Sequence, residues 1–342
     1  MRISVIIPAY NAEKYIEKAV KSVLYHENVN ELIIVEDGSK DRTLNICNNL
    51  QKIDKRILIH THPENQNLGA GASRNLGIQK STCEYLAFLD ADDYYLPNRF
   101  DTEKLIFKSQ KHIDGVYGAL GTHYYSQSAN LKYKRQSNND LTTVKCLSPD
   151  CSAFIGFLGM SKKWTGYFSI DTFTIKRESL SKLEYLFNPE LKLHQDTEFI
   201  IRFLYYNEVI AGIVDKPIAI RGVHDYNRIL SNRNESEHLK KYYSSLLKWY
   251  TSQKTKNLVL NKLKGELKYH DFFSKKSKVN IARLLIFICS DRVLFFNDRY
   301  LQLGAQKVKN GEKLLNLIIR LKEKFINSFL KQKKKKYSVY ID

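Results

Sequence analysis

Short apolar runs alternate with segments of helical periodicity along the first 120 residues. The apolar runs are Ile3–Ile7, Leu32–Val35, Ile57–Thr61 and Glu84–Leu89. Their length and apolar content predict buried strands. Between them, apolar residues recur every three or four positions near residues 16–24, 41–50 and 72–79, which predicts helices. Asn11 is a candidate cap of the first helix, and either Ser39 or Asp41 lies near the cap of the second. Strands and helices that alternate in this way predict parallel β-α-β units, and therefore an α/β fold whose sheet is covered on both faces.

The pattern changes beyond residue 120. Residues 121–170 are rich in Ser, Asn, Tyr and Lys and show weak periodicity, so we expect irregular structure there. Helical spacing returns at Lys176–Leu183 and His194–Tyr206, and an extended stretch follows at Val209–Val223. From about residue 234 the pattern is helical to near the end, which predicts a mainly helical C-terminal extension.

Charge divides the chain in a similar place. The net charge is +19, yet residues 1–225 carry 28 Lys and Arg against 27 Asp and Glu, whereas residues 226–342 carry 27 against 9. A hydrophobic content of 43% excludes a disordered chain. We therefore predict a nearly neutral globular domain over residues 1–225 and a strongly basic helical region over residues 226–342.

Cysteine usage and hydropathy indicate a cytoplasmic protein. The five cysteines show no zinc-type spacing, so we expect reduced thiols. Met1 and Arg2 lead straight into the first predicted strand, and we expect no signal peptide. No apolar run reaches the ~20 residues that a membrane-spanning helix needs.

Three polar segments directly follow predicted strands: Pro8-Ala9-Tyr10, Glu36-Asp37-Gly38-Ser39 and Asp90-Ala91-Asp92-Asp93. Ligands of parallel sheets bind outside the carboxyl ends of the strands, so these segments are expected to converge on one crevice. The three carboxylates of the last segment repel one another, and a hard divalent cation is the usual resolution, together with phosphate oxygens. The alternative is a polar turn that caps the following helix.

Four blocks in this order resemble the family 2 glycosyltransferases: Ser4–Asn11, Val35–Asp41, Asn67–Gly69 with Ser73–Gly77, and Phe88–Asp93. These are inverting enzymes with the GT-A fold, a Rossmann-like and mostly parallel sheet flanked by helices. The resemblance covers about residues 1–225. It implies nucleotide-sugar binding by about residues 1–120 and an acceptor side at about residues 121–225.

The resemblance also implies roles for individual residues. Asp92 and His224 would hold Mn²⁺ or Mg²⁺. Glu36 stands where the family commonly has Asp, so which member of the Glu36–Asp37 pair contacts the base stays open. The implied nucleotide-sugar ligands are Pro8, Ala9, Tyr10, Glu36, Asp37, Asn67, Gly69, Arg74, Asp90 and Arg221.

Inversion requires a base for the acceptor hydroxyl, and Asp196 is the candidate. The family usually shows Glu-Asp at this place, and this chain has Gln195-Asp196. The alternative is that Asp196 and Glu198 simply favour the positive end of the following helix; Glu198 is the second candidate base. Trp164, Tyr167 and Asp171 fall where acceptor contacts are expected, although the aromatic residues could equally belong to the core.

The predicted function is metal-dependent transfer of a sugar, most simply from a UDP-sugar, to a glycan or lipid-linked acceptor in cell-surface polysaccharide synthesis. A sugar-nucleotide-forming nucleotidyltransferase is an alternative, but residues 11–14 lack the glycine-rich loop that a triphosphate requires. A nucleic-acid-binding protein is a third alternative, and the neutral first domain argues against it.

The basic C-terminal region predicts a further partner. An apolar stripe at helical spacing is set among lysines there, at Leu314, Ile318, Leu321, Phe325 and Phe329. Such a helix can lie on an anionic membrane, which predicts a peripheral location at the inner face. The alternative is a stripe that packs on the catalytic domain.

Overall fold

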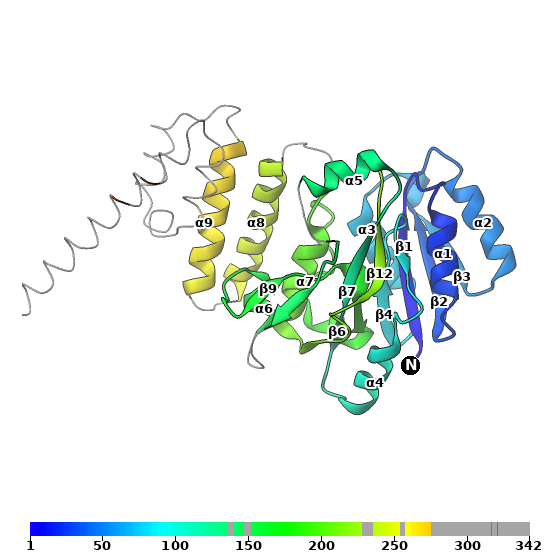
Figure 1. The fold of residues 1–342 in the computed structure, drawn as a ribbon, viewed down its shortest axis with the longest axis horizontal. Helices are drawn as coiled ribbons and strands as arrows, with labels where there is room; N and C mark the ends of the chain where they lie inside the picture. Colours follow the sequence, from blue (N-terminus) through cyan, green and yellow to red (C-terminus); the bar gives the residue numbers. More distant parts are fainter. Residues whose placement is uncertain are drawn as a thin grey trace, which may run out of the picture. The chain divides into compact units, whose positions relative to one another are not determined.

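The computed structural model describes residues 1–135, 140–146, 152–227, 235–253 and 257–274, together with residues 316 and 320. The chain divides into two compact units, Met1–Arg233 and Asn234–Asp342. The first unit is an α/β fold in which helices surround a large sheet (Figure 1). The α/β class predicted from the alternating pattern is therefore confirmed.

Seven strands of the described residues form this large sheet, in the order β11-β6-β10-β4-β1-β2-β3. Their bounds are β1 (Ile3–Ala9), β2 (Val29–Glu36), β3 (Ile57–Thr61), β4 (Tyr85–Phe88), β6 (Gly115–Tyr117), β10 (Phe173–Lys176) and β11 (Val209–Ala211). β1 pairs in parallel with β2 and β4, and β2 with β3, whereas β10 runs antiparallel between β4 and β6. The carboxyl ends of β1, β2 and β4 consequently lie at one edge.

Smaller elements complete the first unit. A second sheet has the order β5-β12-β7, and a hairpin-like pair joins β8 to β9. Their bounds are β5 (Tyr94–Tyr95), β7 (Ala119–Tyr124), β8 (Val144–Cys146), β9 (Trp164–Gly166) and β12 (Pro217–Val223). The helices are α1 (Ile16–Leu24), α2 (Thr43–Ile53), α3 (Ala70–Lys80), α4 (Asp101–Ser109), α5 (Gln127–Lys134), α6 (Ala153–Phe157) and α7 (Gln195–Tyr206), with 3-10 turns η1 (Pro63–Asn65), η2 (Ile170–Thr172) and η3 (Arg177–Lys182).

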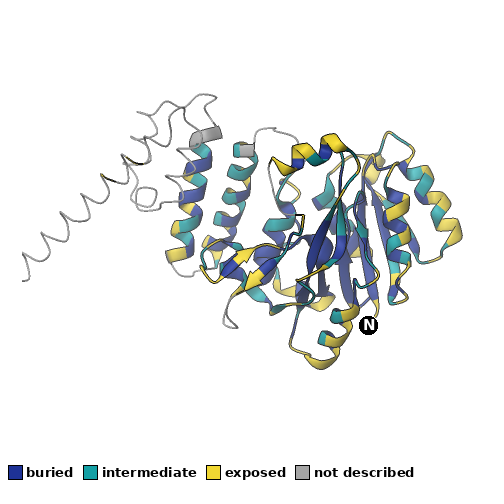
Figure 2. Cartoon of the chain, viewed as in Figure 1, coloured by how far each residue is buried: buried dark blue, intermediate teal, exposed yellow. Residues whose placement is uncertain are grey.

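The central strands are buried on both faces, which explains their near-continuous apolar sequence (Figure 2). Alternate residues of a strand point to opposite faces. Ile3, Val5 and Ile7 of β1 accordingly join the core cluster that includes the buried faces of α1 and α2. Ile6 points the other way, against Gly77 of α3. This burial on both faces fixes the position of β1, and therefore of the segment that begins at Tyr10 directly after it.

Two local predictions need correction, and a third is refined. Asn11 does not cap α1, which begins five residues later; it has a left-handed backbone (φ 49°) and its side-chain oxygen accepts the Lys40 N–H. The segment predicted as a helix at Lys176–Leu183 is the 3-10 turn η3, because β10 extends through Lys176. The extended stretch after residue 209 is two strands in different sheets, β11 and β12. Asp41, by contrast, accepts the N–H of Thr43 at the start of α2, as predicted.

The second unit is helical where it is described. It contains α8 (Glu235–Ser252) and α9 (Asn257–Ser274), which pack against each other. Every residue of the apolar stripe predicted at Leu314, Ile318, Leu321, Phe325 and Phe329 lies outside the described residues. Among the helices that the structure describes, none has the length and hydropathy to cross a membrane.

The close packing of α3 on β1 gives a stability test. A methyl group at Gly77 would lie 2.4 Å from Cγ2 of Ile6, so Gly77→Ala should lower the free energy of unfolding by about 1–3 kcal/mol in urea titrations. Gly71→Ala in the same helix is the control, because its methyl group would meet its neighbours at 3.4 Å or more. It should be neutral or slightly stabilising; an equal loss in both variants would contradict this account of the packing.

Candidate functional site

A cleft of about 440 Å³ opens at the carboxyl ends of β1, β2 and β4. The segments after these strands form one side of it, and the start of α3, the segment before α7 and the segment after β12 complete it. The predicted residues that line it are Pro8, Ala9, Tyr10, Asp37, Asn67, Gly69, Asp90, Asp92 and His224. The predicted residues outside its lining are Glu36, Arg74, Trp164, Tyr167, Asp171, Asp196 and Arg221.

The two acidic residues at the end of β2, Glu36 and Asp37, have different hydrogen-bond partners. Glu36 turns back on its own chain, where its carboxylate accepts the N–H groups of Gly38 (3.1 Å) and Ser39 (2.6 Å). Asp37 reaches the cleft, and its carboxylate accepts the N–H groups of Leu68 (2.8 Å) and Gly69 (2.9 Å). Glu36 therefore shapes the turn, and Asp37 is the member of the pair that lines the cleft.

Two loops approach closely beneath this part of the cleft. Gly38 has φ 74°, and a methyl group there would lie 2.3 Å from the carbonyl oxygen of Asn65, so only glycine fits. Asn67 donates from Nδ2 to the Asp37 carbonyl oxygen at 3.0 Å. Tyr10 stands at the mouth of the cleft with 49% of its surface exposed, so its ring is open to a planar ligand.

Arg74 lies under the cleft. Its Nη2 donates to Oδ1 of Asp90, and its guanidinium is 5.4 Å from the centre of the Phe187 ring. Burial lowers the pKa of Arg74, but the carboxylates of Asp90 and Asp196 outweigh that effect and raise it. Arg74 is thus a fixed cation that orients Asp90 and favours negative charge at this end of the cleft.

Asp92 and His224 meet inside the cleft although 132 positions separate them in the sequence. Nε2 of His224 lies 3.2 Å from Oδ2 of Asp92. Asn227 donates from Nδ2 to the same oxygen at 2.8 Å, and its Oδ1 accepts the His224 N–H. The ring of Tyr15 stacks on the His224 imidazole, with centroids 4.5 Å apart. A carboxylate and an imidazole therefore point together into the space that a ligand would fill.

Among the residues that line the cleft, sequence reasoning did not single out the polar side chains of Tyr15, Lys192, Tyr226 and Asn227. Tyr226 and Asn227 lie two and three positions after His224, and this proximity is the one signal that could have suggested them. Tyr15 and Lys192 gave no such signal, since each reaches the cleft only through the path of the folded chain.

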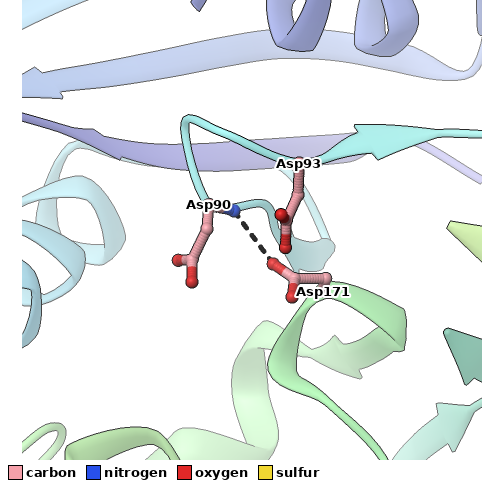
Figure 3. A group of neighbouring side chains, drawn as sticks. All are labelled: Asp90, Asp93 and Asp171. Atoms are coloured by element: carbon pink, nitrogen blue, oxygen red, sulfur yellow. Dashed lines mark hydrogen bonds between the residues drawn. The ribbon is translucent and has the colours of Figure 1, made fainter. Parts of the chain in front are cut away.

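A second carboxylate group lies beside the cleft, formed by Asp90, Asp93 and Asp171 (Figure 3). One oxygen from each lies within 4.8 Å of the others. Asp171 accepts the Asp90 N–H (2.9 Å) and the Ser169 hydroxyl (2.7 Å), and Asp93 accepts a backbone N–H of β12. In Figure 3 the carboxylate of Asp90 is turned away from the other two. Of the three, Asp90 alone lines the cleft, so this group faces protein rather than a ligand.

Burial dominates the electrostatics of that group. It raises the pKa of Asp171 to about 6, with the charge of Asp90 adding to the effect. It also raises the pKa of Asp93 well above the ordinary range, and Asp171 adds to that. Arg221, on β12, opposes both shifts. Arg221 is therefore the counter-ion of buried carboxylates, and in this structure it does not line the cleft.

Asp196 lies in the first turn of α7, where its Oδ1 accepts the Thr197 N–H at 2.8 Å. It is half-buried, outside the lining of the cleft and near enough to Arg74 to affect its pKa. Glu198 is fully buried and paired with Arg202 at 2.7 Å. That ion pair holds Glu198 inside the core and makes it a poor second candidate for a catalytic base.

The three predicted acceptor residues have different surroundings. Trp164 is buried (6% exposed), packs against Gly156 and donates from Nε1 to the Gly166 carbonyl oxygen at 3.1 Å, so its ring belongs to the core. Asp171 is buried in the carboxylate group described above. Tyr167 is 53% exposed and is the one member of the three whose side chain is open to solvent.

Comparison with known proteins shows that this chain is related to glycosyltransferases. The model of glycosyl transferase family 2 matches residues 4–182. An uncharacterized glycosyltransferase of Haemophilus influenzae is 32% identical over 200 residues, which cover 58% of this chain and 70% of that protein. The chain belongs to glycosyl transferase family 2. This membership decides against the nucleotidyltransferase and nucleic-acid-binding alternatives.

One further relative is similar in sequence over part of the chain, and one solved structure is similar in fold. The putative teichuronic acid biosynthesis glycosyltransferase TuaG of Bacillus subtilis is 40% identical over 102 residues, which cover 30% of this chain and 40% of that protein. The structure of S. aureus TarS 1–349 in complex with UDP-GlcNAc matches with a TM-score of 0.62 at 18% identity, over 94% of this chain and 92% of TarS 1–349. This likeness shows a common GT-A fold.

The bonds of Asp37 give a test of how the cleft is built. Asp37→Ala leaves two backbone N–H groups without their acceptor, at a cost of about 1–3 kcal/mol, so amide exchange at Leu68 and Gly69 should accelerate. Hydrogen exchange followed by mass spectrometry or NMR measures this. Asp41→Ala is the matched control, because Asp41 also accepts backbone N–H groups but not from this loop. Unchanged exchange at residues 68–69 in Asp37→Ala would contradict the assignment.

Proposed function

We propose that this glycosyltransferase transfers a sugar from a UDP-sugar to an acceptor hydroxyl with inversion at the anomeric carbon. The observation that carries the proposal is the meeting of Asp92 and His224 in the same cleft as Asp37. Such a cleft offers contacts for a base at one end and for a diphosphate at the other. The complex of the TarS fragment with UDP-GlcNAc supports the choice of donor class.

The base of the donor is assigned to the Asp37 end. The Asp37 carboxylate can accept the N3–H of a uracil, and the exposed Tyr10 ring can lie against the base. Gly69 leaves the backbone open to a ribose or phosphate. Asp90, held by Arg74, is assigned to the ribose hydroxyls. Each of these groups lies on a segment fixed by the buried sheet, so the donor site is largely preformed.

A divalent cation, Mn²⁺ or Mg²⁺, fits the Asp92–His224 pair. The two side chains bring a carboxylate oxygen and an imidazole nitrogen together at the cleft surface. One or two protein ligands leave the remaining coordination positions to diphosphate oxygens and water, as is usual for such ions. When bound, the ion supplies Lewis-acid stabilisation of the diphosphate leaving group. Asn227 holds the Asp92 carboxylate in its orientation.

Asp196 is assigned as the base. It takes the proton of the acceptor hydroxyl as that oxygen bonds to the anomeric carbon, and the bond from the anomeric carbon to the diphosphate breaks on the opposite side. The nucleoside diphosphate departs with the bonding electrons, and the configuration inverts. Tyr167 is assigned to the acceptor side, where its exposed ring can pack on a sugar.

A glycan or lipid-linked acceptor in cell-surface polysaccharide synthesis is part of the proposal. The teichuronic acid relative supports a polysaccharide role. The concentration of positive charge beyond residue 226 supports binding to an anionic membrane surface from the cytoplasmic side.

The metal assignment predicts how UDP binding responds to Mn²⁺. Calorimetry should show that wild-type protein binds UDP more tightly in Mn²⁺ than in EDTA. Asp92→Ala should bind UDP as wild type does in EDTA and gain nothing from Mn²⁺, because the carboxylate ligand is gone. Asp215→Ala, which removes an exposed carboxylate outside the cleft, should respond like wild type. Equal wild-type affinity in Mn²⁺ and EDTA would refute the metal site.

The base assignment predicts a selective loss of turnover. Asp196→Asn retains the shape of the side chain without the proton acceptor, so the rate should fall by roughly 10²–10⁴ while UDP affinity stays nearly unchanged. Glu190→Gln alters an exposed carboxylate in the preceding segment and should leave the rate unchanged. NMR of the product should show an inverted anomeric configuration. Near-normal turnover by Asp196→Asn would move the base elsewhere, and a retained configuration would exclude single displacement.

A further inference from the structure

The third carboxylate of the run after β4 has no part in the proposed chemistry, yet it is buried (5% exposed) at the junction of the two segments that carry Asp92 and His224. One segment is residues 90–93. The other is the end of β12. The antiparallel pairing of β12 with β5 joins Ala219 to Tyr95 and Ile220 to Tyr94. His224 lies four residues beyond that last pair. Over Arg221–Val223 the strand still pairs with β7 on its other side, but not with β5.

Asp93 contacts this part of β12. Its Oδ1 accepts the N–H of Gly222 at 2.8 Å, two residues beyond the last pair of β12 with β5. The two backbones are also in close approach, because a methyl group at Gly222 would lie 2.1 Å from the carbonyl oxygen of Asp92. Two residues after Gly222 comes His224, whose Nε2 is 3.2 Å from Asp92 Oδ2. The hydrogen bond of Asp93 therefore joins the residue after one candidate metal ligand, Asp92, to a residue two positions before the other, His224.

Burying the Asp93 carboxylate costs solvation free energy, so we expect its position to serve a structural or functional role. A carboxylate taken out of water loses solvation, and Asp171 lies close by with the same charge. Arg221 and the Gly222 N–H offset part of that cost. Asp93 lies outside the lining of the cleft, so it cannot act by touching the donor.

We propose that Asp93 is a positioning residue of the donor site, which sets the separation of Asp92 and His224 through its hydrogen bond to Gly222. This inference rests on the proposed function, because it assumes that Asp92 and His224 hold the metal. It assigns to adjacent aspartates two different tasks: Asp92 binds, and Asp93 holds the strand that brings the second ligand.

The test measures the Mn²⁺ concentration that half-saturates the metal-dependent part of UDP binding, by calorimetry on the full chain. Asp93→Ala removes the acceptor of the Gly222 N–H and should raise this concentration by roughly 10–100-fold, as loss of a group that orients a ligand does. Asp93→Asn retains an acceptor oxygen and should stay close to wild type. UDP affinity in EDTA should be the same in all three proteins, since the base end of the cleft is unaffected.

Gly222→Ala alters the same contact from the other side and leaves Asp93 in place. Its methyl group would force the end of β12 away from Asp92, so the half-saturating Mn²⁺ concentration should rise as it does in Asp93→Ala. Asp114→Ala is the matched control. Asp114 also accepts a backbone N–H, from Glu208 at 3.0 Å, but at the start of β6, the opposite edge of the sheet. It should lower the melting temperature without changing the Mn²⁺ response.

A folded Asp93→Ala protein with the wild-type half-saturating Mn²⁺ concentration would overturn the inference. If Asp93→Ala does not fold, a wild-type response of Gly222→Ala overturns it instead. An equal shift in Asp114→Ala would also overturn it, since the effect would then be general destabilisation. UDP binding that is independent of Mn²⁺ in the wild-type protein is a different result, because it refutes the proposed metal site itself.

Discussion

The repulsion among three carboxylates at the carboxyl end of β4 is the constraint on which the candidate site depends. Charges this close are tolerated at the edge of a buried sheet only when each finds its own partner. Asp90 is paired with Arg74 of α3, Asp92 with His224, and Asp93 with a backbone N–H of β12. Arg74 belongs to α3, whereas Gly222 and His224 lie two residues apart at the end of β12 and just beyond it. The partners of one short acidic run therefore bring a helix and the end of a strand together around a single cleft.

Carboxylates act throughout this site as acceptors for loop backbone. Loops lack the regular bonding of helices and strands, so their buried N–H groups need other acceptors. Glu36 accepts from its own turn, Asp37 from the loop before α3, and Asp171 from the N–H of Asp90. Acidic residues near the cleft thus have a structural role, a chemical role or both. Asp37 holds a loop and also lines the cleft, so the proposed contact to the base would add a chemical role to its structural one.

The parallel half of the fold follows from the sequence, because strands buried on both faces must be apolar throughout and the intervening helices must show one apolar face. β1, β2, β3 and β4 lie where the pattern indicates. The antiparallel insertion of β10 and the small sheet of β5, β12 and β7 do not follow from it. These strands are short or irregular, and their partners are distant in the sequence. Asn11 shows the same limit at a turn, where a polar residue can either cap a helix or adopt a left-handed backbone.

The sequence by itself determined the family, the α/β class and the placement of acidic residues at the carboxyl ends of strands, because those features depend on local order and periodicity. The family resemblance already indicated Asp92 rather than Asp93, but only the tertiary structure decided that Asp37 rather than Glu36 faces the cleft. It also brought Asn227 onto Asp92 across 135 positions. In a loop, the direction of a side chain is set by the partner that satisfies it, and for Asp37, Asp92 and Asp93 the partners are supplied by distant segments of the folded chain.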